Sequence, residues 1–423
     1  MRPVKLQKPL YFFGICAKIE AERNHFGGTD LKILFVVNNV YATGNGLSAS
    51  ARRTAEYLRA TGEEVKFLSG ANPDQDGPEP DFLLGEFKVP IFDGLIRQQG
   101  YTFASHERDV IREAVKWADL VHLEEPFFLE MAVARIAEEE GKPITGTYHL
   151  HPENLYASIH MGWEKALNTT TLRLWRDAVF NKCLIVQCPT ENVKERLVRY
   201  HFRPELRVIS NGLLIEDKGE DADVNALVDP AARYHVLYIG RLSVEKDPFT
   251  LLRAMEFCRH RDKLQLIFAG RGPIEEKVKA EAQALVEKGV LPHAPSFAFL
   301  PIGKLQALAR KADLYVHCAT IEVEGLSCLE AIGTGLVPVI AKAKLSATSQ
   351  FALSPKSTFP AGNPKALAAR IDDWLDHDEE RSREAERYKA LPEQYAIEKS
   401  IAALREMFAD AIALHNTQKN RQK

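Results

Sequence analysis

Short apolar runs alternate along the chain with longer stretches whose apolar residues recur at helical spacing. Five strand-like runs stand in the first half: "LKILFVV", "EEVKFLS", "ADLVHLE", "KPITGTYH" and "KCLIVQCP". Patterns typical of amphipathic helices lie between them, over residues 49–61, 105–117 and 129–141. Strands separated by helices of this length pair in parallel, so the pattern predicts a doubly wound, Rossmann-like α/β domain. We place this domain at residues 31–215, after an N-terminal extension over 1–30.

The alternation stops in a polar segment and then begins again. Residues 216–232 are rich in Asp, Glu and Gly and predict a linker. After it, "YHVLYIG", "LQLIFAG", "ADLYVHC" and "VPVIA" predict the strands of a second Rossmann-like domain over residues 233–390. Two such domains predict a cleft that the carboxyl ends of their parallel strands face. The Pro/Gly-punctuated residues 71–104 predict a long loop region at the mouth of that cleft.

The last apolar pattern is helical. Ile397, Ile401, Leu404, Phe408 and Ile412 recur at a spacing that places them on one helix face. We therefore expect a C-terminal helix over residues 391–415 that packs on a domain. The polar residues 416–423 predict a frayed tail.

Composition and charge narrow the class of protein. The 423 residues are 45% hydrophobic and 27% charged with a net charge of −3, which predicts more than one ordinary globular domain. No run reaches the about 18 apolar residues of a membrane span, and residues 9–17 lack the context of a signal peptide. Residues 1–213 carry 28 acidic and 26 basic side chains, so we expect no nucleic-acid partner, and charge gives no support to membrane docking.

The cysteines bear on the cellular compartment. The six cysteines form no C-x-x-C pair and read as small buried hydrophobic residues. Scattered thiols without a secretion signal are typical of a reducing compartment. We therefore expect a cytoplasmic protein.

The segment "HCATIEVEGLSCLEAIGTGLVPVIA" has the most informative chemistry. A strand over 312–318 leads to a loop with Glu322 and Gly325, a helix begins near Leu326, and Glu330 lies about one turn inside it. The free N–H groups and the macrodipole of such a helix start bind anions. An anion cradle between two carboxylates suits a ligand with central phosphates and hydroxyls at both ends, such as a nucleotide-sugar. A capped helix with solvent-facing glutamates is the alternative.

Two further strand ends add candidates. In "YIGRLSVEKDP", Gly240 permits a tight turn, and Arg241 and Lys246 can neutralise a diphosphate leaving group. Solvated surface charges are the alternative interpretation. In "IFAGRGP", Gly270 and Gly272 stand where the backbone would pass close to a ligand, although a plain turn explains them equally well.

These segments, in this order, resemble the retaining GT-B glycosyltransferases of the large "group 1" family. Glu322, Gly325 and Glu330 meet the family pattern E-x-x-G-x-x-x-x-E. The resemblance covers about residues 31–415 and is strongest in the C-terminal half. It implies the GT-B fold, in which two Rossmann-like domains face each other across a cleft.

The resemblance also implies roles for individual residues. By analogy, Arg241 and Lys246 hold the donor diphosphate. Glu322 contacts the hydroxyls of the donor sugar, and Glu330 holds the ribose.

The start of the predicted helix has a role in the same resemblance. The amides of Leu326 and Ser327 would cap the diphosphate. Glu324 departs from the apolar residue that is common at its position, which alters the pocket expected around the sugar.

The N-terminal half resembles the family more loosely. "VHLEEPF" and "GTYHLHPENLY" look like two family segments, and the resemblance places His149 near the donor sugar and the reacting centre. An isolated histidine of this kind would otherwise be a core residue. Glu124 stands where relatives often carry His, and we assign it no role. His149 and His151 could form half of a metal site, but no third ligand is apparent and the family usually needs no metal, so we predict none.

The stretch "NNVYATGNGLSASARR" satisfies the G-x-G-x-x-G/A fingerprint of dinucleotide-binding folds. Its context does not fit, because the apolar run 31–37 stops six residues before Gly44 and the next strand ends in Ser69-Gly70 without an acidic residue. The resemblance instead makes this a loop that approaches the donor phosphates, with Gly46 as the best single candidate. A flexible helix cap and a dehydrogenase site are the alternatives.

The sequence thus predicts a retaining hexosyltransferase. The donor would be a nucleoside diphosphate sugar, UDP-glucose or similar, with GDP-mannose also open. The acceptor would be a glycan, a lipid or a small molecule, and the reaction would need neither cofactor nor metal. The alternatives are a GT-B epimerase or phosphorylase, or a catalytically silent sugar-nucleotide-binding protein.

Overall fold

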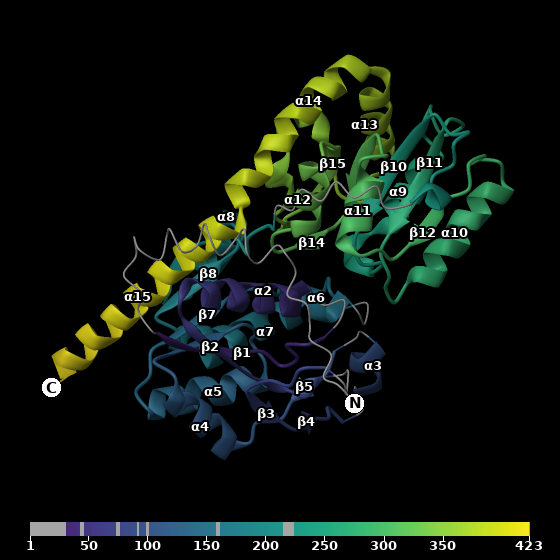
Figure 1. Cartoon of the computed structure of the whole chain (residues 1–423). Coiled ribbons are helices and arrows are strands. Elements are labelled where there is room, and N and C mark those ends of the chain that lie inside the picture. Colours follow the sequence, from purple (N-terminus) through teal and green to yellow (C-terminus); the bar gives the residue numbers. More distant parts are fainter. Residues whose placement is uncertain are drawn as a thin grey trace, which may run out of the picture.

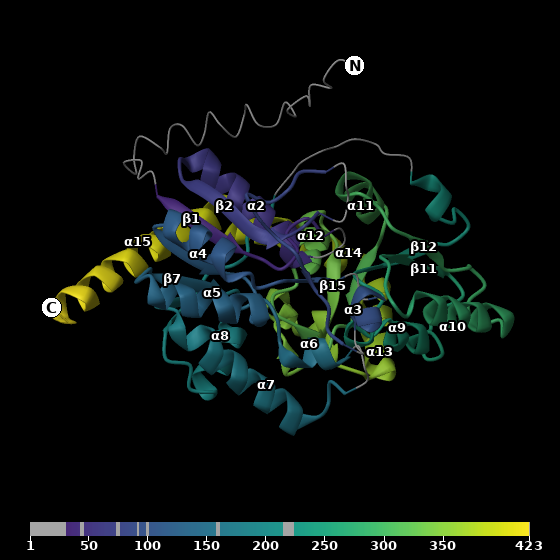
Figure 2. The same ribbon diagram turned by 90° about the horizontal axis from the view of Figure 1, so that it is seen from below.

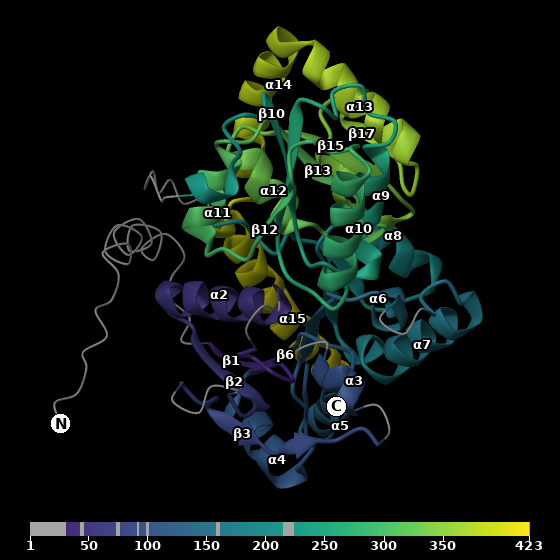
Figure 3. The same cartoon turned by 90° about the vertical axis from the view of Figure 1, so that its right-hand side faces the viewer.

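The protein is described by a computed structural model that covers residues 31–42, 46–72, 77–90, 93–98, 101–157, 161–214 and 224–422. Within these ranges two α/β domains lie one above the other (Figures 1 and 3). The expected N-terminal extension, residues 43–45 of the glycine loop and residues 216–223 of the predicted linker lie outside the described residues.

The N-terminal domain is a seven-stranded sheet whose neighbouring strands are all parallel. The strand order is β3-β2-β1-β6-β7-β8-β9. The five predicted strands and three predicted helices are all present. The sheet strands are β1 (Lys32–Val36), β2 (Glu64–Gly70), β3 (Phe82–Leu84), β6 (Leu120–Leu123), β7 (Ile144–Thr147), β8 (Ile185–Cys188) and β9 (Glu205–Val208). The main helices are α2 (Gly46–Thr61), α4 (Arg108–Trp117), α5 (Phe128–Glu139), α6 (Pro152–Ala157), α7 (Lys165–Ala178) and α8 (Glu191–Arg199).

Residues 71–104 contain more structure than the expected loop. β3 extends the edge of the sheet, while β4 (Glu86–Phe87) and β5 (Phe103–Ala104) pair antiparallel, with α3 (Asp93–Gln98) between them. The reason is burial, because Leu84 and Ala104 are almost fully buried in the domain core. These apolar stretches between Pro and Gly residues are too short for their sequence pattern to predict strands, and they form strands because they pair with other segments.

The C-terminal domain repeats the same topology with six parallel strands in the order β12-β11-β10-β13-β15-β17. Its four predicted strands are present. The sheet consists of β10 (Tyr234–Ile239), β11 (Leu264–Ala269), β12 (Ser296–Ala298), β13 (Leu314–His317), β15 (Val337–Lys342) and β17 (Thr358–Pro360). The helices are α9 (Pro248–Ala254), α10 (Glu275–Glu287), α11 (Ile302–Ala309), α12 (Leu326–Gly333), α13 (Pro364–Asp376) and α14 (Asp378–Ala390).

Each sheet reverses its strand order next to its first strand, between β1 and β6 and between β10 and β13. In open parallel sheets, ligands bind outside the carboxyl ends of the strands at such reversals. α2 lies on the side of the N-terminal domain that faces α12 (Figures 1 and 3). We therefore expect a site shared by the two domains at the carboxyl ends of the strands beside these two reversals.

The C-terminal helix α15 (Ile397–Gln422) returns to the N-terminal domain, along which it runs in Figures 1 and 2. Ile397, Ile401, Leu404 and Phe408 are buried there with β1 residues, as the helical pattern predicted. Its bounds differ from the expected 391–415. Residues 391–395 form a 3₁₀ turn instead, and the helix continues through 416–422, where we expected a frayed tail. Lys419 and Arg421 in its last turn favour this extension, because cations there interact well with the helix dipole.

The structure also describes the cysteines and shows whether any helix could span a membrane. The five cysteines in the described ranges are buried and free of disulfides. Across the described part of the chain, no helix is both long enough and apolar enough to cross a bilayer.

Candidate functional site

The structure brings the predicted cation and carboxylate together beyond the carboxyl ends of β10 and β13. Lys246 ends a 3₁₀ turn, η3 (Val244–Lys246), and Glu322 ends the short strand β14 (Ile321–Glu322) just before α12. The Lys246 ammonium forms an ion pair with the Glu322 carboxylate, and both side chains are largely buried. Residues 76 positions apart in sequence therefore meet at one place.

Charge at this place is concentrated. Burial, opposed by the charge of Glu245 and assisted by that of Arg241, lowers the pKa of Lys246 to about 8. Lys246 is therefore still mostly charged at neutral pH. Arg241 lies in the same loop and is exposed. The loop after β10 can thus present two cations to an anionic ligand.

α12 begins at Leu326, as the sequence predicted. Gly325 precedes it with φ +90°, and a Cβ there would lie 2.2 Å from Thr348 Cγ2. Glycine is therefore required by both the backbone conformation and the space. Leu326 and Ser327 are the first helical residues, whose amides have no carbonyl partner within a helix. These amides lie directly after the loop that carries Glu322.

Glu330 has a different environment from Glu322. It is partly buried on α12, and burial raises its pKa to about 7, with Arg53 of α2 opposing the shift. Arg53 also donates to the carbonyl of Gly212 at 2.8 Å. The structure thus places Glu330 at the boundary between the domains, facing a cation of the other domain that the sequence analysis did not single out.

The candidate glycines divide into two groups. Gly240 has φ +151°. A Cβ on Gly270 would lie 1.9 Å from the carbonyl oxygen of Gly240. A Cβ on Gly272 would lie 2.1 Å from the carbonyl oxygen of Leu242. The contact between two loops thus accounts for these glycines. Gly46, by contrast, is the exposed first residue of α2, and a Cβ there meets nothing within 4 Å.

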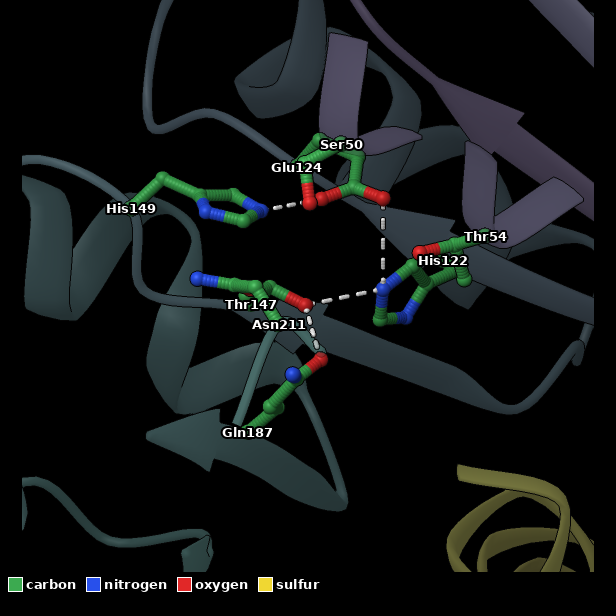
Figure 4. A pocket seen from close by; sticks show the side chains of 8 residues that line it. All are labelled: Ser50, Thr54, His122, Glu124, Thr147, His149, Gln187 and Asn211. Atoms are coloured by element: carbon green, nitrogen blue, oxygen red, sulfur yellow. Dashed lines mark hydrogen bonds and ion pairs between the residues drawn. The ribbon is translucent and has the colours of Figure 1, made fainter. Parts of the chain in front are cut away.

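On the N-terminal domain, His149 follows β7 and points toward Glu124, which follows β6 (Figure 4). His149 Nε2 lies 2.6 Å from Glu124 Oε2, and Glu124 is buried. Burial acts to raise the pKa of Glu124, but the hydrogen bond and the charge of His149 hold it below its usual value. Because a carboxylate only accepts, Nε2 is the protonated ring atom and Nδ1 remains available for other contacts.

A small polar pocket surrounds this pair (Figure 4). His122 lies 3.7 Å from Glu124 and 3.0 Å from Thr147 Oγ1, which donates to Gln187 at 2.7 Å. Burial lowers the pKa of His122 to about 4, so the ring is neutral at physiological pH. The lining residues are Ser50, Thr54, His122, Glu124, Thr147, His149, Gln187 and Asn211. Helix α2, strand ends and the interdomain segment after β9 thus meet at His149.

His151 does not join His149. It is fully buried, its Nδ1 lies 3.1 Å from the Tyr148 hydroxyl, and burial lowers its pKa well below the usual value. The described partner of His151 is therefore Tyr148, and that of His149 is Glu124. Across the described ranges, no three His, Cys, Asp or Glu side chains are grouped as metal ligands.

Sequence reasoning missed Arg53 and His317 at these places, and it gave no role to Glu124. His317 ends β13, where its Nδ1 lies 2.7 Å from the Tyr315 hydroxyl and its Nε2 lies 3.8 Å from Glu322 Oε2. Burial and then the charge of Lys246 lower its pKa to about 3, so the ring is neutral. Its place at a strand's carboxyl end was the signal that could have found it.

The fold and the site together define a two-domain α/β protein with an anion-attracting helix start beside cations and carboxylates at its strand ends. Comparison with known families makes the assignment specific. Residues 220–390 match the family described as Glycosyl transferases group 1, and residues 44–216 match Glycosyltransferase Family 4. The chain therefore belongs to the group 1 glycosyltransferases of the GT-B fold, which transfer a sugar from a nucleotide-sugar.

Known relatives and structures agree with this assignment. The chain is 24% identical to the alpha-monoglucosyldiacylglycerol synthase of Streptococcus pneumoniae, over 74% of this chain and 71% of that protein. It is 27% identical to the phosphatidyl-myo-inositol mannosyltransferase of Mycobacterium leprae, over 80% of this chain and 86% of that protein. The structure of Anabaena HepE in complex with UDP and glucose matches with a TM-score of 0.69 and 17% identity, covering 90% of this chain and 100% of that one. This last similarity establishes the fold.

Proposed function

We propose that this glycosyltransferase moves a hexose from UDP-glucose, or a similar nucleoside diphosphate sugar, to a lipid hydroxyl with retention of configuration. The observation that carries the proposal is the Lys246–Glu322 ion pair directly before the start of α12. A cation, a carboxylate and free amides then stand within one site. The lipid acceptor rests on the relatives, whose names specify diacylglycerol and phosphatidylinositol lipids.

In this proposal the diphosphate is stabilised by fixed positive groups. Departure of the nucleotide builds negative charge on the diphosphate, and Arg241, Lys246 and the amides of Leu326 and Ser327 would face it. Preorganised donors of this kind are effective because they need no reorganisation during the reaction. The residues supply this electrostatic stabilisation themselves, so the proposal needs no metal ion.

Carboxylates bind the two ends of the donor. Glu322 would exchange part of its contact with Lys246 for the sugar hydroxyls, with the neutral ring of His317 beside it. Glu330 would accept from the ribose hydroxyls. Both roles require acceptors that are desolvated and oriented before the donor arrives, as the partial burial of both residues favours.

His149 would lie beside the reacting centre, held in one orientation by Glu124. The Glu124 carboxylate is buried and engaged by His149, so we give it a positioning role and not that of a covalent nucleophile. Attack on the same face as the leaving group, with the departing phosphate taking the acceptor proton, accounts for retention without such a nucleophile.

The test is nucleotide release from UDP-glucose and from GDP-mannose, with and without diacylglycerol in detergent micelles. Lys246→Ala and Glu322→Ala are each expected to lower kcat/KM at least ~100-fold, as loss of a preorganised transition-state contact does. Lys263→Ala and Glu276→Ala, at exposed sites of the same domain, are the matched controls.

Product analysis completes this test. The anomeric proton coupling of the glycolipid would report retention or inversion. Wild-type turnover in Lys246→Ala and Glu322→Ala would remove these residues from the donor site. Nucleotide binding without any transferred or hydrolysed sugar would instead favour a silent binding protein, and a changed free sugar would favour an epimerase.

A further inference from the structure

Glu324 is a buried carboxylate in the loop that separates Glu322 from α12, and only 3% of its surface is exposed. The family resemblance gives no role to this residue. Its hydrogen-bond donors come from the other side of the domain boundary. Oε1 accepts from the Ser210 hydroxyl, and Oε2 accepts from the backbone N–H of Asn211 at 3.1 Å and from its side-chain amide at 2.7 Å.

Ser210 and Asn211 belong to the crossover segment, which we define as residues 209–213 between β9 and the linker. The crossover segment is hydrogen-bonded to residues 395–397, where the chain returns from the C-terminal domain to the N-terminal domain. The Leu213 N–H donates to Tyr395 O at 2.7 Å, and the Ile397 N–H donates to Leu213 O at 3.0 Å. Gly212 has φ +76°, and a Cβ there would lie 2.5 Å from Ile397 Cδ1. The two crossings between the domains thus form one closely packed unit.

Two more contacts join the same loop and helix to the N-terminal domain. The Thr190 hydroxyl, at the start of α8, donates to Val323 O at 3.1 Å. Arg53 donates to Gly212 O and lies close enough to Glu330 to affect its pKa. The loop 321–325 thus contacts α8 as well as the crossover segment, and Arg53 of α2 lies between that segment and α12.

The chemistry of Glu324 explains why an apolar residue would not serve here. A buried carboxylate is unfavourable unless its oxygens are hydrogen-bonded, and this one receives three hydrogen bonds from two consecutive residues. An apolar side chain would leave the Asn211 N–H and both polar side chains without this acceptor. Burying the acid at this position is therefore favourable only as part of the link to the crossover segment.

We propose that Glu324 is a positioning residue that links the loop 321–325 to the crossover segment, so that the placement of Glu322 and the arrangement of the two domains change together. The link itself follows from the contacts of Glu324. Its effect on sugar transfer rests on the proposed function, because it acts through Glu322. Donor binding would then be transmitted to the domain crossings, and disturbance of the crossings would weaken the donor site.

The experiment compares Glu324→Leu with Glu324→Gln in the full chain. Leucine restores the apolar character common in the family and removes the acceptor. Glutamine keeps the link, because its Oε1 can accept from Asn211 while its amide donates to the Ser210 hydroxyl. Hydrogen exchange of peptides covering 208–214 and 320–328, with and without UDP, is the first readout. KM for UDP-glucose and kcat are the second.

We expect Glu324→Leu to speed amide exchange in 208–214 at least tenfold and to abolish any UDP-dependent protection there. KM for the donor should rise at least tenfold with a smaller change in kcat, because the donor contacts are displaced and not removed. Glu324→Gln should remain within about threefold of wild type in both readouts. Ser210→Ala, which removes one of the three hydrogen bonds, should speed exchange in 208–214 about threefold alone and should add nothing to Glu324→Leu.

Wild-type exchange and KM in Glu324→Leu would overturn the inference, as would equal loss in the Leu and Gln variants. If Glu324→Leu fails to fold by circular dichroism, Ser210→Ala decides, since unchanged exchange at 208–214 in that variant also overturns the link. The exchange readout uses UDP and needs no turnover. Uncoupled exchange in Glu324→Leu combined with no sugar transfer by wild type would therefore refute the proposed function and support the link.

Discussion

Glu322 and Glu330 are carboxylates of one short segment, yet the structure gives them different surroundings. Glu322 has a cation of its own domain as its ion-pair partner, whereas Glu330 is desolvated and has Arg53 of the other domain near it. Burial raises the pKa of Glu330 to about 7. A carboxyl group whose pKa is higher in the folded than in the unfolded state stabilises the fold at low pH and loses this contribution as pH rises through the folded-state pKa.

This direction of the pH dependence gives a prediction for Glu330→Gln, whose side chain at position 330 is uncharged at every pH. At pH 8 the variant should be more stable than wild type by about 1–3 kcal/mol, since each pKa unit is worth about 1.36 kcal/mol. The difference should vanish near pH 4.5. Urea denaturation at pH 4.5, 6 and 8 measures this difference, with Glu276→Gln at an exposed position of α10 as the control. A difference that stays constant over this range would contradict the desolvation of Glu330.

At the same scale, the limits of sequence reasoning are clear from His149 and Glu124. The strand-end rule and the family resemblance identified His149. Its partner could not be predicted, because the pair depends on how β6 and β7 align, and the register Leu123↔Gly146 is set by packing across the sheet. Glu324 was noted as a departure from the family, but its donors lie 113 and 114 positions away in sequence.

The elements that position the site are short loops packed against one another. The loop after β10 and the loop after β11 approach so closely that glycine is the only residue whose side chain fits at 270 and 272. This contact fixes the path of the loop that carries Arg241 and Lys246. The requirement for glycine at these two positions therefore follows from backbone packing between the loops.

Gly270→Ala should therefore destabilise the C-terminal domain by about 1–3 kcal/mol or more, the usual cost of overpacking. The added methyl would lie 1.9 Å from Gly240 O, and backbone must move to relieve it. Gly303→Ala in α11 is the matched control, since a Cβ there meets nothing within 4 Å and alanine favours helix. Thermal unfolding of the two variants compares them, and equal midpoints would refute the loop contact.

Strands and helices were the most predictable elements. Runs such as "LKILFVV" and "YHVLYIG" became β1 and β10 with bounds shifted by one or two residues. Residues 71–104 were predicted poorly, because β3, β4 and β5 are only two or three residues long and owe their form to tertiary partners. Periodicity needs a longer window than these segments offer.

At the scale of the whole molecule, α15 makes the N-terminal domain depend on residues from the far end of the described chain. Phe408 is fully buried in the cluster that includes Phe35 and Leu58, and its ring lies 5.2 Å from that of His122. The helix thus supports the sheet beneath the polar pocket as well as the core. The sequence predicted its apolar face but not which domain it would cover.

Phe408→Ala should destabilise the protein by about 3–5 kcal/mol, as expected for removing a buried aromatic ring. Leu414→Ala, on the same helix but 40% exposed, should change stability by less than about 1 kcal/mol. Chemical denaturation followed by the fluorescence of buried Trp175, in the N-terminal domain, would report the difference. Equal effects of the two substitutions would show that α15 does not complete this core.

The return of α15 has a consequence for biosynthesis. A ribosome produces β1 to β9 first, then all of the second sheet, and only afterwards the helix that covers Ile33 and Phe35. The nascent first domain therefore has an uncovered apolar face while roughly 190 further residues, from the end of β9 to the start of α15, are synthesised, and exposed apolar surface of this kind is prone to aggregate. Chaperone dependence during translation, relieved when residues 397–411 are supplied as a separate peptide, is the behaviour this chain order implies.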